Sequence, residues 1–527
     1  MADRTIVQWD KDDLAELGLI KIDLLGLGML SLLRDAFALY RGVYPERPPL
    51  SLAAIPADDP PTYAMMQRAD TIGVFQIESR AQQSMLPRLK PVRFYDVVIQ
   101  VAIIRPGPIQ GEMIHPFLRR RNGQEPVTYP HPKLEPILRR TLGVPLFQEQ
   151  GMRMAVEAAG FTPGQADQLR RAMGHKRSHQ RMAEIYPKLV NGMVENGIDE
   201  TAARQLFHML EGFADYGFPE SHAASFALLA YASAYVKCHE PAIFLAAILN
   251  VQPMGFYATE VLVNDARRHG VTVKPVEVNA SRWWSFVDGD GAVRLGFHIV
   301  RGLGEGQQKT LEHALGEGEF ADVLEFARRT QLSREALENL AASGAFAPWY
   351  DARREAMWAL RGLTERETRG ELGRRMEIRE PEPDLAALAP AETTRFDIVT
   401  LGVTTGPQPI AHFRAELERK NVLAAERLAA MPNNLVCKVG GMVITRQRPG
   451  TAKGFVFLTL EDETGLVNVI VRPDVYERYR RTIRMAQALV IEGKLQKESG
   501  CIDLLGRRFW ELDTAGTTEK VRARNFH

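Results

Sequence analysis

Cysteine is scarce in this chain, because only Cys238, Cys437 and Cys501 occur in 527 residues and they lie far apart. They form neither a metal-ligand spacing nor a disulfide framework, which favours a reducing, cytoplasmic compartment. Long apolar runs are lacking too, since no stretch approaches the roughly 18 residues that a transmembrane helix needs. The first residues resemble neither a signal peptide nor a transit peptide. These absences predict a cytoplasmic protein without membrane contact.

A net charge of either sign is also missing. The 66 basic side chains are balanced by 65 acidic ones, which leaves a formal charge of +1. Charge summed over the whole chain therefore says nothing about nucleic acid, and only a local excess can. With 45% hydrophobic and 25% charged residues, the composition is that of an ordinary globular protein. The length allows about three or four domains.

Two classes of catalytic site are excluded by the motifs that are absent. No glycine-rich loop ending in Gly-Lys-Ser or Gly-Lys-Thr occurs, so the chain has no P-loop nucleotide site. Ser221 and His222 are adjacent, a spacing that does not pair a nucleophile with its base, and no partner acid is apparent. We therefore reject a hydrolase triad.

What the chain does contain is helical periodicity over residues 70–275 and strand-like alternation over residues 435–512. The apolar spacing predicts helices at 148–159, 163–173, 179–195, 199–213, 222–237 and 241–249. A small helical module is expected at 293–346, and a charged, then Pro/Ala-rich linker at 364–394. Alternating segments at 436–439, 455–460, 466–471 and 489–493 predict a small five-stranded barrel.

The helical region contains a local excess of positive charge. Fourteen lysines and arginines stand against seven acids between Arg105 and Lys188. A solvated basic face explains such an excess without any ligand. Binding to an anionic partner is the other interpretation.

Asp23 stands alone in an apolar segment, Leu19–Leu24, which we expect to be a strand before a helix from about Leu27. An acid in that setting is paired, caps the helix or holds a metal ion. Lys21 lies on the same face of the expected strand and is a candidate salt-bridge partner. Arg105 directly follows the apolar segment Val97–Ile104, which is predicted as either a strand or a helix, and precedes a rigid Pro-Gly-Pro turn. That position suits a forked contact to phosphate, although a surface arginine at a turn looks the same.

Two further segments are suited to a triphosphate. In the first, Arg170, Arg171, Lys176 and Arg177 surround the expected end of a helix at Gly174, where the helix dipole explains part of the positive charge. In the second, Ser221 is expected as the N-cap of a long apolar helix and His222 as a residue of its first turn. Free amide groups at such an end bind phosphate readily.

Glycine turns and a basic, aromatic groove are candidate sites for nucleic acid. Gly302, Gly304 and Gly306 precede a helix from about Gln307, and Gly344 marks a second turn about forty residues on. In a helix-hairpin-helix such a turn between two helices lets backbone amides approach DNA phosphates, although a plain turn has the same sequence. The expected barrel has either a nucleic-acid groove or a protein-interaction surface. The candidate groove residues are Arg446, Arg448, Lys453, Phe455, Arg472 and Tyr476.

Several of these segments, in this order, resemble the C-family bacterial DNA polymerases, the alpha subunit of DNA polymerase III and its relatives. The similar segments are Leu19–Leu27, Gly73–Arg80, Arg105–Pro108, Leu146–Gln150, Leu169–Gly174 and Ser221–Ala223. The resemblance implies a multi-domain α+β protein with mostly helical fingers, a tandem helix-hairpin-helix module and a C-terminal OB-type barrel. The implied boundaries are palm 1–45, fingers 46–290, hairpins 291–360, helical linker 361–430, OB domain 431–515 and tail 516–527.

The resemblance also implies roles for the candidate residues. Asp23 would be the third catalytic, Mg²⁺-binding aspartate with Lys21 as its basic neighbour. Arg105, Arg170, Arg171, Lys176, Ser221 and His222 would lie near the nucleotide. Gly302, Gly304, Gly306, Gly344 and the barrel residues Arg446, Arg448, Lys453 and Phe455 would contact DNA. The implied reaction is template-directed DNA synthesis.

Within the family, Pro219-Glu220 replaces the Asn-Lys that is usual in replicative enzymes, which points to the error-prone, damage-tolerant ImuC branch. This branch implies primer-template DNA, dNTP, an inactive Y-family-like protein and an accessory mutasome protein as partners. Contact with the sliding clamp would be indirect, although Gln82–Leu86 faintly resembles a clamp-binding motif.

The PHP domain and the palm strand with two further aspartates, both typical of the family, are not expected in this sequence. Two-metal nucleotidyl transfer needs more than one carboxylate, so we expect the chain alone to be inactive. It resembles the C-terminal half of an error-prone polymerase. A replicative alpha-subunit fragment and a non-catalytic DNA-binding scaffold stay open as alternatives.

Overall fold

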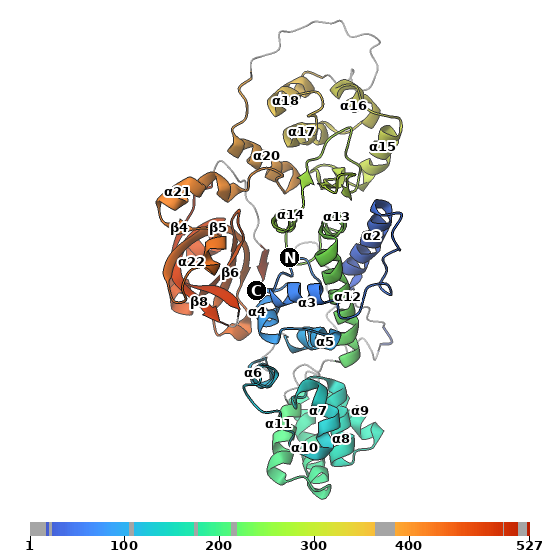
Figure 1. Ribbon diagram of the computed structural model, residues 1–527, viewed down its shortest axis with the longest axis vertical. Coiled ribbons are helices and arrows are strands. Elements are labelled where there is room, and N and C mark those ends of the chain that lie inside the picture. Colours follow the sequence, from blue (N-terminus) through green and yellow to red (C-terminus); the bar gives the residue numbers. More distant parts are fainter. Residues whose placement is uncertain are drawn as a thin grey trace.

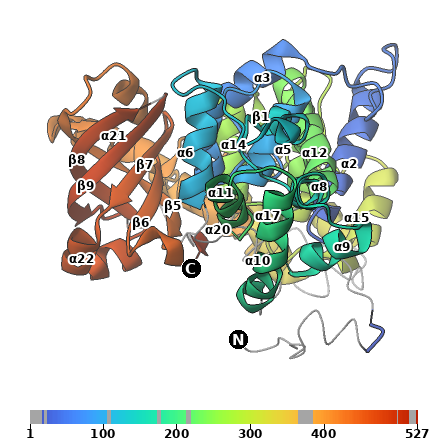
Figure 2. The ribbon, with the colours of Figure 1, turned by 90° about the horizontal axis from the view of Figure 1, so that it is seen from below.

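Helices build most of this chain, and a closed barrel of strands builds its C-terminal part (Figure 1). The computed structural model describes residues 17–19, 24–104, 110–172, 178–211, 219–363, 385–498, 500–514 and 524–526. The helical parts follow one another along the long axis, and the barrel lies beside the middle of this row. The view from below shows the barrel on the same flank of the helical body (Figure 2). Among the described helices, none combines the length and apolar character that a membrane crossing requires.

The helix α12 (Glu220–His239) runs through the centre of the helical body. It packs against helices on several sides, and its own buried residues are mostly alanine or larger apolar side chains. The surrounding helices are α2 (Leu27–Val43), α3 (Pro60–Gln67), α4 (Arg80–Leu89), α5 (Phe94–Ile103), α13 (Pro241–Asn250) and α14 (Thr259–Arg268). The apolar segment at 97–104, for which the sequence left strand and helix open, is therefore mostly helix α5.

A second group of helices forms a lobe with its own apolar core, reached through α6 (Gln110–Arg121). In Figure 1 this lobe lies at the lower end of the molecule. Its helices are α7 (Glu135–Leu138), α8 (Gln148–Ala159), α9 (Pro163–Ala172), α10 (Ser178–Glu195) and α11 (Glu200–Glu211). The four helices predicted over 148–213 are confirmed with ends shifted by two residues at most, because each has a continuous apolar stripe.

Beyond α14 the chain forms a small sheet, a helical module and one linking helix. The sheet has the order β1-β3-β2, from β1 (Val273–Lys274), β2 (Phe286–Val287) and β3 (Val293–Arg294). The module comprises α15 (Glu305–Gly316), α16 (Val323–Thr330), α17 (Arg334–Ser343) and α18 (Arg353–Arg361), and the linking helix is α20 (Pro390–Leu401). The helical module predicted over 293–346 is confirmed in its helices α15 to α17. It shares one apolar core with α2, α13 and α14.

The barrel closes through five strands in the order β5-β6-β7-β9-β8, with β8 pairing back to β5. One pair, β7 with β9, is parallel, and helix α22 (Pro473–Met485) fills the connection between β7 and β8. This is the OB topology, so the predicted barrel is confirmed. The strands are β5 (Val436–Gln447), β6 (Val456–Glu461), β7 (Leu466–Val471), β8 (Ala488–Glu498) and β9 (Cys501–Glu511); α21 (Arg414–Arg419), β4 (Val422–Leu423) and β10 (Arg524–Phe526) flank them.

The long strand β5 changes pairing partner near its middle. It pairs with β8 through residues 436–442 and with β6 through residues 442–447. At Gly441 a Cβ atom would lie 2.8 Å from the carbonyl oxygen of Glu461, so only glycine allows the strands to approach this closely. The glycine pair at 440–441 therefore helps the sheet to curve into a barrel.

Candidate nucleic-acid interface

Five residues with predicted chemical roles lie outside the described residues. They are Lys21, Asp23, Arg105, Lys176 and Arg177. The predicted strand of Asp23, its metal-binding role and the phosphate contacts of Arg105 and Lys176 therefore stay predictions. The described candidates occupy the start of α12 and the end of α9, the glycine turns, and the barrel.

The start of α12 differs from the prediction. The residue before the helix is Pro219, and Ser221 is already the second helical residue, so the prediction of Ser221 as N-cap is wrong. The physical reason is a contact from another helix: the Glu220 N–H donates to Oε2 of Glu149 on α8 at 2.8 Å. A carboxylate thus satisfies one of the free amides that a phosphate would otherwise use.

Aromatic rings and a second carboxylate complete this helix start. The Tyr95 hydroxyl donates to Oε1 of Glu220 at 2.7 Å, and burial together with this carboxylate raises the pKa of Tyr95. Arg140 lies over the Tyr95 ring, 5.5 Å from its centroid. The rings of His222 and Phe226 are 4.1 Å apart between centroids. His222 therefore lies in the first turn, as predicted, and packs on the next turn of its own helix.

Arg170 and Arg171 lie near the end of α9, as predicted, and both bind one carboxylate. Their Nε atoms lie 2.9 Å and 2.8 Å from the two oxygens of Asp167. The hydrogen bond from Arg170 is the main reason that the pKa of Asp167 lies below its usual value. Helix α9 packs on α8, the helix that supplies Glu149 to the start of α12. Helix α8 therefore contacts both α9, which carries Arg170 and Arg171, and the start of α12, which carries Ser221 and His222.

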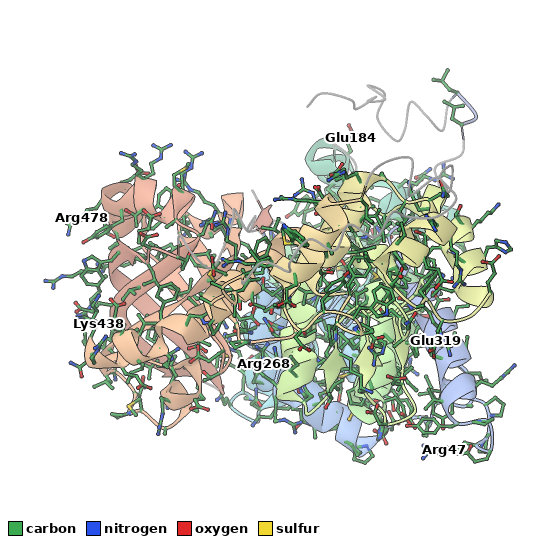
Figure 3. All side chains as sticks on the ribbon, turned by 90° about the horizontal axis from the view of Figure 1, so that it is seen from above. Arg47, Glu184, Arg268, Glu319, Lys438 and Arg478 are labelled. Carbon is green, nitrogen blue, oxygen red and sulfur yellow. The ribbon has the colours of Figure 1, made fainter. Side chains whose placement is uncertain are left out.

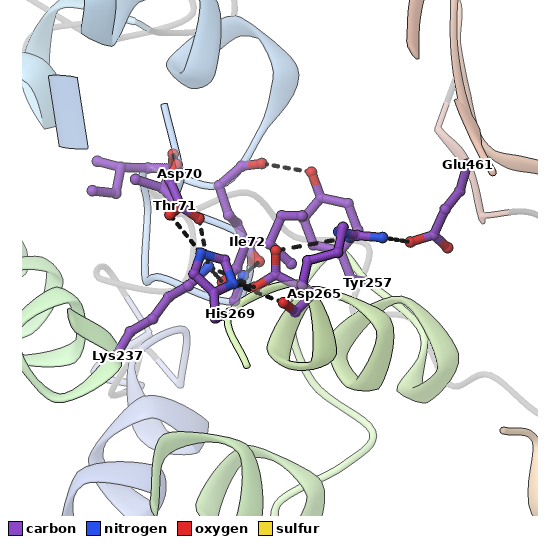
Figure 4. A network of polar contacts seen from close by, with 12 residues as sticks. Asp70, Thr71, Ile72, Lys237, Tyr257, Asp265, His269 and Glu461 are labelled. Atoms are coloured by element: carbon purple, nitrogen blue, oxygen red, sulfur yellow. Dashed lines mark hydrogen bonds and ion pairs between the residues drawn. The ribbon is translucent and has the colours of Figure 1, made fainter. Parts of the chain in front are cut away.

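A buried polar network occupies the opposite end of α12 (Figure 4). Lys237 Nζ lies 2.7 Å from Asp265 Oδ2 and 3.2 Å from Asp70 Oδ1, and it donates to the Ile72 carbonyl at 3.1 Å. His269 Nε2 lies 2.6 Å from Asp70 Oδ2. Burial alone would raise the pKa of Asp70, but the His269 hydrogen bond and the Lys237 charge outweigh it and lower that pKa to about 2.

Among the described residues, Asp70, Asp265 and His269 are the one group of three whose ligand atoms could converge on a metal ion. The ammonium of Lys237 lies between the two carboxylates and neutralises them. A cation would have to displace it, so this set does not fit a catalytic metal site. The network is better explained as a buried salt-bridge cluster that fixes α12, α14 and the segment before α4.

The same network extends to the barrel. Arg268 Nη1 donates to Oε1 of Glu461 at 2.9 Å, and Asn264 Nδ2 donates to Oε2 at 3.4 Å. Burial of Glu461 raises its pKa to about 7, although the Arg268 charge works in the other direction. Helix α14 is therefore one of the elements that hold the barrel against the helical body.

The glycine turns have clear structural reasons. Gly302 has φ +85° and packs on α17, where Asn339 Nδ2 donates to the Arg301 carbonyl at 2.9 Å. Gly304 precedes α15, and its N–H donates to Gln307 Oε1 at 2.9 Å; Gly306 lies in the first turn of α15. A strand and a short 3₁₀ turn, and no full helix, precede the first turn, so the expectation of two flanking helices is wrong there. Its DNA contact stays a prediction.

Gly344 ends α17 with φ +83°, and a Cβ atom there would lie 2.8 Å from Arg353 Nε. Arg353 in turn binds Asp397 Oδ1 at 2.6 Å. This glycine is thus needed for a buried ion pair between α18 and α20. A contact of Gly344 with DNA phosphate is compatible with that role and also stays a prediction.

The predicted groove residues of the barrel have different surroundings. Arg446 donates from Nε to the Ile483 carbonyl at 2.8 Å and from its terminal nitrogen to the Ala486 carbonyl, so it caps the end of α22. Arg448 and Lys453 are exposed and Phe455 is half-buried in the β5–β6 loop. Tyr476 is buried in the barrel core under Arg448, so its prediction as a member of an exposed groove is wrong. The helical turn of α22 points this ring inward.

The sequence reasoning missed Arg80, which links the helical body to the barrel. Its guanidinium donates to the carbonyls of Val469 at 2.9 Å and Leu458 at 3.1 Å, and it binds Asp503 Oδ1 at 2.9 Å. It also lies 4.8 Å from the centroid of Phe457. No local pattern marks such a contact, because its partners lie nearly four hundred residues away in the sequence.

The comparisons with known proteins agree with this architecture. Three family models match: the bacterial DNA polymerase III alpha subunit finger domain at 29–197, a helix-hairpin-helix motif at 270–356, and an OB-fold nucleic acid binding domain at 437–508. The helix-hairpin-helix and OB-fold matches confirm that these two modules are present, in the predicted order.

Curated relatives match over the whole chain. The error-prone DNA polymerase of Anaeromyxobacter sp. (strain K) is 50% identical over 545 residues, which cover 100% of this chain and 48% of that protein. Those of Alkalilimnicola ehrlichii and Pseudomonas paraeruginosa are 50% and 47% identical, with 51% and 52% of their length covered. The chain thus spans about half the length of the curated relatives it matches. Over its whole length the chain is thus similar to error-prone DNA polymerases, and residues 29–197 match the finger domain of the bacterial DNA polymerase III alpha subunit.

Proposed function

We propose that this chain forms the fingers, hairpin and barrel part of an error-prone DNA-directed DNA polymerase that acts in translesion synthesis. The observation that carries this proposal is the identity of 50% with an error-prone polymerase along the whole chain. The order of finger, hairpin and OB modules supports it. The domain boundaries given above are part of the proposal.

In the proposed reaction the primer 3′-hydroxyl oxygen attacks the α-phosphorus of a dNTP. The bond from that phosphorus to the bridging oxygen breaks, and pyrophosphate leaves. Arg105, Arg170, Arg171, Lys176, Ser221 and His222 are proposed to contact the nucleotide. Positive groups held near the phosphates stabilise the charge that develops on them. Gly302, Gly304, Gly306 and Gly344 are proposed to contact duplex phosphates, and Arg446, Arg448, Lys453 and Phe455 the single strand.

Mg²⁺ is the proposed metal, with Asp23 as a ligand and Lys21 beside it. When bound, such an ion neutralises the transferring phosphoryl group. The two residues lie outside the described part of the chain, and within that part the group of Asp70, Asp265 and His269 does not fit.

The proposed partners are primer-template DNA, dNTP, an inactive Y-family-like protein and an accessory protein of a mutasome. Contact with the sliding clamp is proposed to be indirect. The burial of Gln82, Met85 and Leu86 in α4 supports this, because a clamp-binding motif has to be accessible.

The test is binding of primer-template DNA and of dATP to the chain. We expect both to bind, and the double change Arg170→Ala with Arg171→Ala to weaken dATP binding about tenfold, because two charge-assisted contacts are lost. The duplex affinity should change less. Arg204→Ala is the matched control, since Arg204 forms a similar exposed pair with Glu200 in the same lobe. Absence of DNA binding would refute the proposed function, and equal losses for duplex and dATP would refute the triphosphate assignment.

A further inference from the structure

Helix α22 and strand β9 form a basic surface on the barrel, here called the α22 face. Its members are Arg478, Arg480, Arg481 and Arg484 of α22 with Arg507 and Arg508 of β9, and all six are exposed. Figure 3 shows Arg478 at the outer flank of the barrel, away from the helical body. Because the net charge of the whole chain is only +1, this is a local excess.

The two arginines of β9 reach the same surface through an irregularity of the strand. The register between β8 and β9 shifts between Glu492 and Gly493, which pair with Arg508 and Gly506. Arg507 is therefore the extra residue of a β-bulge, and both arginines are exposed where regular alternation would turn one inward. The ring of Tyr479 on α22 lies 5.5 Å from that of Phe509, between centroids, and so brings α22 alongside the bulge.

Acidic side chains neutralise little of this surface. Glu477 lies 3.8 Å from Arg480, and Glu492 lies 3.7 Å from Arg508, both long contacts between exposed groups. Within the described part of the chain, Arg478, Arg481, Arg484 and Arg507 have no carboxylate within 4.0 Å. Arginines in this state attract phosphate, because they have no carboxylate to release first.

The barrel face that usually binds oligonucleotides is covered here. OB folds bind single strands across their second and third strands and two neighbouring loops, which correspond to β6, β7, the β5–β6 loop and the β8–β9 turn. Of these, the β5–β6 loop keeps Arg448 and Lys453 exposed. Arg80 lies on β6 and β7 and donates to a carbonyl of each strand, and its helix also reaches the β8–β9 turn, where Cys501 Sγ lies 3.3 Å from the Ser84 carbonyl. A strand of nucleic acid on this face would have to displace α4.

An aromatic side chain beside the α22 face favours nucleic acid over an acidic protein. Trp510 follows Arg508 by two residues on β9, so the two side chains point to the same side of the strand. The indole is 43% exposed, and Lys438 Nζ lies 5.7 Å from its centroid. Exposed rings among cations are what single-stranded DNA binds, by base stacking and phosphate contact.

We infer that the α22 face binds single-stranded DNA, with phosphates on the arginines and a base on Trp510. The binding path lies outside the face that Arg80 covers. This inference rests on the proposed function for the choice of DNA as the ligand.

The test is the affinity of the chain for a fluorescent oligothymidylate and for a blunt duplex, over a range of salt concentrations. The triple variant Arg478→Glu, Arg481→Glu, Arg507→Glu should bind the oligothymidylate about tenfold more weakly or worse, and its salt slope should fall by about 2, since three phosphate contacts are lost. Duplex affinity should stay within twofold. Trp510→Ala should weaken the oligothymidylate with an unchanged salt slope.

Three control variants show whether the loss of binding is specific to the α22 face. Arg419→Glu with Arg427→Glu changes exposed charges in the segment just before the barrel and should leave oligothymidylate binding within twofold. Arg80→Ala, which uncovers the β6–β7 face, should also leave oligothymidylate binding within twofold. The charge-preserving variant Arg478→Lys, Arg481→Lys, Arg507→Lys should retain most of the affinity, which excludes misfolding as the cause.

The inference is overturned if the triple variant keeps its oligothymidylate affinity, in which case an acidic protein partner is the better occupant. It is overturned too if Arg80→Ala or Arg448→Ala with Lys453→Ala changes binding while the triple variant does not. If the unmodified chain does not bind duplex DNA, the proposed function is refuted instead.

Discussion

Two basic regions of this chain differ in what their arginines contact. In the helical region at 105–188, most of the described arginines bind carboxylates: Arg119 and Arg120 bind Glu125, Arg121 binds Asp96, Arg139 binds Glu135, and Arg170 and Arg171 bind Asp167. On the α22 face, arginines of α22 and of the β9 bulge stand exposed, and their nearest carboxylates are distant or lacking within the described residues.

The difference shows that the number of basic residues in a segment does not measure its attraction for DNA. The helical region was the basic block that the sequence brought to attention, yet much of its charge is neutralised locally. The α22 segment is short and lies within the barrel, so it did not stand out in a count. Positive charge that lacks a nearby carboxylate contributes most to the binding of phosphate.

We expect the largest effect from removing the Arg80 side chain. This change should weaken the contact by which α4 covers the β6–β7 face of the barrel, so that this face becomes as accessible as the α22 face. Arg80→Ala leaves two carbonyls and Asp503 without their partner, and removing one member of such a pair costs about 3 kcal/mol. Hydrogen exchange should therefore rise in β6, β7 and α4, and less in Arg80→Lys. Unchanged protection of these strands would show that Arg80 does not hold the barrel.

The contact between α14 and the barrel predicts a pH dependence. Because burial raises the pKa of Glu461 to about 7, its protonated form is favoured in the folded state. Stability should therefore fall as the pH rises from about 4.5 to about 7, by an amount on the order of 2 kcal/mol. Unfolding by urea at several pH values should show this decline, and Glu461→Gln should reduce it; the remainder comes from Glu260, whose pKa burial raises to about 8. A decline of equal size in both proteins would contradict the assignment to Glu461.

The ion pair of His269 and Asp70 should make the free energy of unfolding fall both at neutral pH and at acidic pH. The hydrogen bond to Asp70 raises the pKa of His269, so its contribution is complete below about 6.5 and is lost as the pH rises further. The pKa of Asp70 is lowered to about 2, so its contribution is present above about 4 and is lost as the pH falls toward 2. Asp70→Asn should abolish both effects in a thermal melt. Persistence of the acidic edge in this variant would contradict the account.

We expect the smallest effect from releasing Arg170 and Arg171 from their carboxylate, which makes them resemble the arginines of the α22 face. Asp167→Asn removes the carboxylate that Arg170 and Arg171 share, and should strengthen dATP and DNA binding about threefold, because exposed ion pairs are weak. The matched control is Glu200→Gln, which releases Arg204 in the same lobe. Equal gains in the two variants would mean that Arg170 and Arg171 are no closer to a binding site than Arg204.

The sequence was sufficient for elements with a regular pattern and insufficient where distant residues decide. The helices at 148–159 and 163–173 and four strands of the barrel could be predicted from their spacing. Strand β9 was not singled out, because the bulge at Arg507 interrupts its alternation. The N-cap prediction at Ser221 failed because Glu149, on another helix, supplies the capping carboxylate.

In the predicted site, too, local motifs placed some residues correctly, whereas contacts between distant residues could not be predicted. Arg170, Arg171 and His222 lie where their local motifs put them, although their ligand contacts stay predictions. Tyr476 was misplaced because burial of its ring depends on how α22 packs on the barrel. The cluster of Asp70, Lys237 and Asp265 joins three segments that are distant in sequence, so no local pattern could have indicated it.

The central claim is that this chain holds duplex DNA and a single-stranded template on different surfaces. The most direct measurement compares its affinity for a blunt duplex with that for the same duplex carrying a single-stranded template overhang. We predict that the overhang strengthens binding about tenfold through its extra phosphate contacts, and that Arg478→Glu with Arg481→Glu removes this gain while blunt-duplex affinity is kept. An overhang gain that survives in this variant, or no gain in the unmodified chain, would contradict the account.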